Sequence, residues 1–70
     1  MKYDVSVQWD EEAGVWCAFC DKIPLSLESN SLDLLIFRTR MVAQEILEIN
    51  GDFNVDARLR FITSHEVSIV

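Results

Sequence analysis

Two cysteines separated by two residues are the side chains of this sequence with the most obvious capacity for chemistry. Cys17 and Cys20 lie in the segment VWCAFC, and a C-x-x-C spacing serves redox couples and zinc sites when it occupies a helix start or a tight loop. The aromatic residues around this pair favour a strand instead. In a strand, the offset of three places the two side chains on opposite faces, with Cα atoms about 10 Å apart, too far for a disulfide. We therefore expect Cys17 in the core, Cys20 on the other face of the sheet, and no redox or metal site.

The other polar residues do not form a recognisable catalytic or cofactor-binding motif. Asp10, Glu11 and Glu12 crowd one turn but lack the spacing of a calcium-binding loop. His65 follows Ser64, and neighbouring strand residues point to opposite faces, so they do not form a base–nucleophile pair. We expect no cofactor and no enzyme.

A small-ligand-binding domain or an uncharacterised enzyme domain is the alternative that the sequence leaves open. Its pocket would lie near Trp9, Trp16 and Cys17. A shift in thermal stability on addition of a metal or a nucleotide would support this alternative, because ligands that bind only the folded state stabilise it.

Length and charge limit the classes of protein that this chain can represent. Its 70 residues allow one domain, residues 1–70. Twelve acidic and six basic residues give a net charge of −6, which argues against direct binding to nucleic acid and suits either simple solubility or docking on a basic protein. No apolar segment has the length of a signal peptide or a membrane span, so we expect a cytoplasmic protein without a membrane partner.

The first third of the chain has the period of strands. Residues 2–9 alternate between apolar and polar side chains, which predicts a half-buried strand. The polar turn that follows ends in Gly14, which suits the left-handed position of a hairpin loop, and residues 15–20 form the returning strand. Pro24 ends that strand, and the segment LSLES predicts a short third strand.

The middle of the chain predicts one long helix, from Leu32 to Asn50. Ser31 suits the N-cap, Asp33 lies in the first turn, and Gly51 suits the C-terminal cap. One broad apolar stripe is wide enough to cover a sheet. Its members are Leu32, Leu35, Ile36, Val42, Ala43, Ile46, Leu47 and Ile49.

A second apolar group lies on the opposite side of this helix. Leu34, Phe37 and Met41 cluster within about 60° of one another. A helix on a single sheet has no internal use for this group, so we expect it to contact a second copy or another protein. Partial shielding by long neighbouring side chains, or by the C-terminal end of the chain, is the alternative.

The last part of the chain alternates again and predicts a final strand, followed by a bend at Ser64 and His65. One face of this strand is mostly apolar: Val55, Ala57, Leu59, Phe61 and Thr63. Arg58 and Arg60 share the other face, where Trp16 is expected to join them in a contact patch. Pairing of one arginine with Asp4 on the first strand is the equally weighted alternative. The complete pattern is an α+β fold, β-β-β-α-β, with an antiparallel sheet and one long helix packed on one face.

The order of these motifs resembles the HicB-like domains of bacteria. The resembling segments are YDVSVQWDEEAGVWCAFCDKIP and LSLESNSLDLL, with Asp21 and Pro24 where that family has its turn. The resemblance covers roughly residues 3–50. It implies a truncated ribonuclease H-like fold without an active site, and a role in binding.

HicB proteins are antitoxins that mask a small basic ribonuclease toxin. The resemblance therefore implies a non-enzymatic interaction module, closest to the short HicB-like proteins of unknown function, with a small basic toxin as the partner. Many HicB proteins also carry a DNA-binding segment, which the pattern up to Val70 does not contain. We expect a protein partner and a homodimer, with no direct contact to nucleic acid. The expected interface residues are Leu34, Phe37, Met41, Trp16, Arg58 and Arg60.

Overall fold

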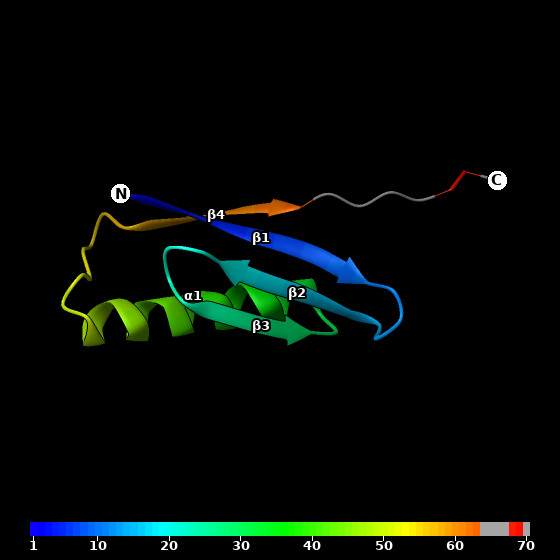
Figure 1. The fold of residues 1–70 in the computed structure, drawn as a ribbon, viewed down its shortest axis with the longest axis horizontal. Coiled ribbons are helices and arrows are strands. Elements are labelled where there is room, and N and C mark those ends of the chain that lie inside the picture. Colours follow the sequence, from blue (N-terminus) through cyan, green and yellow to red (C-terminus); the bar gives the residue numbers. More distant parts are fainter. Residues whose placement is uncertain (64–67, 70) are drawn as a thin grey trace.

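Four strands form one sheet, and a single long helix lies on one of its faces (Figure 1). The computed structural model describes residues 1–63, 68 and 69, so the bend expected at residues 64 and 65 lies outside the described residues. The elements are β1 (Lys2–Asp10), β2 (Val15–Cys20), β3 (Leu25–Ser29), α1 (Leu32–Ile49) and β4 (Arg58–Thr63). This arrangement confirms the expected α+β class and the order β-β-β-α-β.

The sheet is mixed, which corrects the expectation of a wholly antiparallel sheet. Its strand order is β3-β2-β1-β4, and the first three strands form an antiparallel meander. β4 pairs parallel with β1, with Arg58 opposite Lys2 and Phe61 opposite Val5. The helix accounts for the difference, because it returns the chain to the end of the sheet where β3 began. β4 therefore runs in the same direction as β3, which is also the direction of β1.

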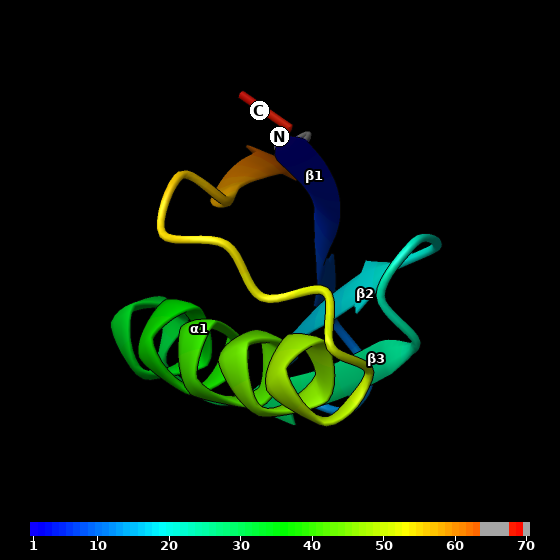
Figure 2. The same ribbon diagram turned by 90° about the vertical axis from the view of Figure 1, so that its left-hand side faces the viewer.

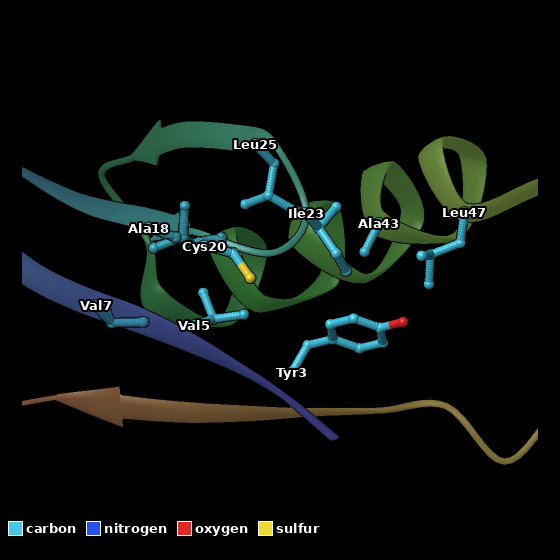
Figure 3. Close-up of a cluster of buried hydrophobic side chains, with 10 residues drawn as sticks. Tyr3, Val5, Val7, Ala18, Cys20, Ile23, Leu25, Ala43 and Leu47 are labelled. Atoms are coloured by element: carbon cyan, nitrogen blue, oxygen red, sulfur yellow. The ribbon is translucent and has the colours of Figure 1, made fainter. Parts of the chain in front are cut away.

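Alternation along the strands separates an inner face, which packs on the helix, from an outer face that no element of the described chain covers. Tyr3, Val5 and Val7 of β1 point inward and are buried. Figure 3 shows these side chains converging with residues from β2, β3 and the helix. The buried apolar core consists of Tyr3, Val5, Val7, Ala18, Cys20, Ile23, Leu25, Leu35, Ala43 and Leu47.

Both ends of the helix are capped as the sequence predicts. The Ser31 hydroxyl accepts a hydrogen bond from the Leu34 amide at 3.3 Å. At the other end Gly51 has a φ of +76°, and its amide donates to the Glu48 carbonyl. The next amide, that of Asp52, donates to the Leu47 carbonyl, which completes a Schellman motif.

Two apolar residues assigned to apolar faces from the sequence are exposed instead, as is Thr63 at the end of β4. Ile49 is 83% exposed because it is the last residue of the helix and lies about 200° around the helix axis from the buried Leu47. Val55 is 89% exposed because it lies in the loop before β4 and not in the strand. Conversely, Thr39 is fully buried in the middle of the inner helix face, a position that the apolar pattern did not include.

The helix covers only part of the inner face. It packs against β3 and β2, while β4 lies away from it at the far edge, as the end-on view in Figure 2 shows. The loop of residues 50–57 spans this separation. Leu59 and Phe61 therefore contact the core but stay half-buried.

Candidate interaction surfaces

The outer side of the helix carries three half-exposed apolar side chains, which we call the outer stripe. Leu34 is 47% exposed, Phe37 is 53% exposed and Met41 is 51% exposed. They face away from the sheet because the buried residues Leu35, Thr39, Ala43 and Leu47 occupy the opposite side of the helix. Neither shielding by neighbours nor packing within the described chain removes the outer stripe from solvent.

Charged side chains border the outer stripe. Helical spacing places Glu45 and Glu48 on the next turns of the same side, and Gln44 donates a hydrogen bond to Glu48 at 3.1 Å. Arg40 lies with its guanidinium carbon 6.0 Å from the centre of the Phe37 ring, a cation–π distance. The C-terminal half of this surface is therefore acidic, and its N-terminal half is apolar with the basic side chain of Arg40 beside Phe37.

Trp16 does not join Arg58 and Arg60, which corrects the patch expected from the sequence. The register of β1 and β2 pairs Trp16 with Trp9, and the two rings lie 5.2 Å apart at an angle of 58°. Trp16 is half-buried and packs against the core, on the inner face. The arginines lie in register with Lys2 and Asp4 on the outer face. The expectation was wrong because the hairpin register, which decides the face, cannot be obtained from alternation within β2 alone.

Arg60 forms the ion pair that the sequence offered as the alternative. Its Nε and Nη2 atoms donate to the two carboxylate oxygens of Asp4 at 2.9 and 3.1 Å. These hydrogen bonds lower the pKa of Asp4 below its usual value of 3.8, against a smaller effect of desolvation, and the charges of Lys22 and Lys2 add to the lowering. Arg58 is exposed on the same face.

The cysteines lie on opposite faces of the sheet, as expected, but each occupies the face assigned to the other. Cys20 is buried in the core, whereas Cys17 is half-buried on the outer face opposite Gln8. Both are free thiols. Among residues 1–63, 68 and 69, no group of three or more histidine, cysteine or acidic side chains could hold a metal ion.

Two hollows lie on the outer face of the sheet, on either side of Phe19. We call the first the mixed hollow, because two lysines and two aspartates line it; it measures about 270 Å³. Its lining residues are Lys2, Asp4, Ser6, Phe19, Asp21 and Lys22. The second, the acidic hollow, measures about 390 Å³. Its lining residues are Gln8, Trp9, Asp10, Glu11, Glu12, Cys17 and Phe19.

The acidic hollow is the place where a ligand pocket near Trp9 and Cys17 was expected. Trp16 does not line it, because its side chain packs against the core on the inner face. Sequence reasoning did not identify Phe19, which is 40% exposed and separates the two hollows. Phe19 alternates with Ala18 and Cys20 along β2. This alternation predicts that Phe19 lies on the outer face only if Ala18 and Cys20 are known to lie on the inner face.

A third hollow, of about 410 Å³, lies between the C-terminal half of α1, the loop after it and the start of β4. Leu47, Phe53 and Leu59 supply much of its apolar lining. It exists because the helix does not reach β4.

No helix within the described residues is long and apolar enough to cross a membrane.

Comparisons with known proteins place the chain in a family without assigning it an activity. A domain of unknown function, DUF1902, matches residues 2–70, and the chain belongs to this family. The fold is similar to the crystal structure of the hypothetical protein TTHA1013 from Thermus thermophilus, an extremely thermophilic bacterium. The TM-score is 0.83 at 31% sequence identity, covering 99% of this chain and 100% of the other. No curated protein matches the chain.

Proposed function

We propose that this member of the DUF1902 family is a non-enzymatic protein-interaction module that binds a small basic protein through the outer stripe of α1. The observation that carries the proposal is the exposure of Leu34, Phe37 and Met41 on the side of the helix away from the sheet. Three half-exposed side chains leave roughly 300 Å² of apolar surface, the size of the functional patches on small monomeric proteins.

Charge supports a basic partner. Glu45 and Glu48 extend the outer stripe by two turns, and the whole chain carries a net charge of −6. Charges at the rim of an interface steer the encounter and select the partner, while the apolar centre supplies most of the affinity. The resemblance to HicB-like antitoxins suggests the class of this partner, a small basic ribonuclease toxin that the module masks in the cytoplasm.

Self-association is the second activity that we propose for the chain. The outer stripe by itself is small for this purpose, since a specific dimer interface covers at least about 1,000 Å² in total, or about 500 Å² on each subunit. We assign the outer stripe, together with the charged side chains that border it, to a different protein, and a pairing of two copies to another surface.

The test is a tagged pull-down from the native cell with Leu34→Asp and Phe37→Asp combined. Binding of the partner would remove water from two new carboxylates in the centre of the outer stripe without pairing them. The variant should therefore fail to retain the small basic protein that the wild-type chain retains. A variant with Ile49→Asp and Val55→Asp carries the same charge change at two more exposed apolar positions and should retain it. Retention by both variants, or no basic protein with wild type, would contradict the proposal.

A further inference from the structure

The outer face of the sheet has opposite charges at its two ends. Four of the six basic residues of the chain, Lys2, Lys22, Arg58 and Arg60, lie at the end where β1 begins, and because Asp4 and Asp21 lie there too, this end has a net excess of positive charge. The other end carries three consecutive acidic residues at the β1–β2 turn, which line the acidic hollow. The carboxylate of Asp4 experiences the basic end directly, since Arg60, Lys22 and Lys2 all lower its pKa.

Phe19 stands at the middle of this face and borders both hollows. In the pairing of β1 with β2, Phe19 lies opposite Ser6. Cys17, two residues before Phe19 in β2, lies opposite Gln8. Ile62 of β4, 49% exposed, also lies opposite Ser6, on its other side. The face therefore has an apolar projection at its centre, with one hollow toward each charged end.

We propose that two copies of this chain pack outer face to outer face about a two-fold axis that lies between the sheets, perpendicular to the strands. This operation reverses the strand direction, so the basic end of each copy faces the acidic end of the other. It also places Phe19 of each copy over the acidic hollow of the second copy, whose lining includes Cys17 and Gln8. The contact is self-complementary and closed, as symmetric dimers require.

The size of the face supports a dimer. Four strands about 4.8 Å apart and five to nine residues long cover a flat area of about 400 Å². Two such faces together have a flat area of about 800 Å², and the side chains that project from them raise the accessible area toward the roughly 1,000 Å² that a specific interface needs. Packed sheets separated by about 10 Å leave room for the phenylalanine side chains between them. The outer stripe of each helix stays exposed, so a dimer would present two docking sites for the basic partner.

Charge reversal with rescue tests the arrangement by light scattering on a sizing column. The wild-type chain should elute at twice its mass of 8.1 kDa. Lys2→Glu with Lys22→Glu places acidic residues against the acidic end of the second copy, and Glu11→Lys with Glu12→Lys places basic residues against the basic end. Each pair should weaken dimerisation at least about tenfold, and all four substitutions together should restore it, because the charges are exchanged and attract again.

Asp10 stays unchanged in these variants because its side chain accepts hydrogen bonds from the Glu12 and Ala13 amides in the turn. Glu45→Lys with Glu48→Lys, on the helix, is the matched control for Glu11→Lys with Glu12→Lys, and it should leave the dimer intact. Phe19→Asp, at a 40% exposed position, should give a folded monomer by circular dichroism.

Three results would overturn the proposal. These are a monomeric wild-type chain at all concentrations, a dimer insensitive to both reversals, or reversals that weaken it without rescue. A dimer that only Leu34→Asp with Phe37→Asp dissolves would also overturn it and assign self-association to the outer stripe. If Phe19→Asp abolishes the dimer but still retains the basic partner, the proposed dimer is supported. This result would also show that dimerisation and binding of the basic partner use different surfaces.

Discussion

At the scale of single residues, Thr39 is the most unusual member of the core. It is fully buried in the middle of α1, and its Oγ1 atom has no hydrogen-bond partner among the described residues. A buried hydroxyl without a partner loses its hydrogen bonds to water and gains none in return. The apolar pattern of the helix skips this position, which is why sequence reasoning placed no core residue there.

Thr39→Val should therefore stabilise the protein. The substitution replaces the hydroxyl by a methyl group of similar size, and we expect the free energy of unfolding to increase by about 1 kcal/mol in urea denaturation. Thr63→Val, at an exposed position of β4, is the control and should change it by less than about 0.5 kcal/mol. A loss of stability in Thr39→Val would mean that the hydroxyl has a role in the folded protein.

The Asp4–Arg60 ion pair predicts a dependence of stability on pH. Because the folded protein lowers the pKa of Asp4 below 3.8, the ionised carboxylate stabilises the fold at higher pH. This contribution is lost as the pH falls below 3.8 and through the lowered pKa of the folded state. Both side chains are more than half exposed, so the effect is small and decreases with salt.

Melting temperatures of wild type and Asp4→Asn should therefore differ at neutral pH and converge in acid. Wild type should melt higher at neutral pH, and the difference should disappear as Asp4 becomes protonated. Arg60→Gln removes the same pair from the other side and should show the same convergence toward wild type. A difference that stays constant across this range would show that the pair contributes nothing to the pH dependence.

At the scale of elements, the parallel strand β4 explains which parts of the fold were predictable. Alternation and capping residues located the strands and the helix, because these signals depend only on neighbouring residues. The direction of β4 depends on where the helix returns the chain, and the face of Trp16 depends on the hairpin register. Both are relations between segments, and a single sequence does not display them. The outer stripe was predictable because helical geometry is local.

The edge position of β4 predicts alternating hydrogen exchange along the strand. The Arg58 amide donates to the Met1 carbonyl, so the amides of residues 58, 60 and 62 point toward β1. Those of residues 59, 61 and 63 point to the open edge and should exchange much faster when followed by NMR. Equal protection of both sets would mean that another chain covers this edge, contrary to a dimer formed by the outer faces.

At the scale of the whole molecule, the helix is too narrow for the sheet that it covers. One helix is about 10 Å across, whereas four strands span about 19 Å, so β4 lacks a covering layer. The sequence contains enough apolar residues for a core. It does not show which of them are buried within one molecule and which are buried between two molecules. The proposed docking surfaces follow from this mismatch, because apolar side chains without an internal partner remain available to other chains.

The pairing of the first strand with the last also affects how the protein is synthesised. Residues 2–7 leave the ribosome early, but their parallel partners are residues 58–63, which are made almost a whole chain later. During that interval β1 has an unpaired edge, which is the kind of surface that joins nascent chains to one another. The meander and the helix can form before this strand arrives, but the sheet closes only after residues 58–63 have been made. Rapid synthesis of the residues between β1 and β4 would therefore shorten the time for which this edge is unpaired and reduce aggregation.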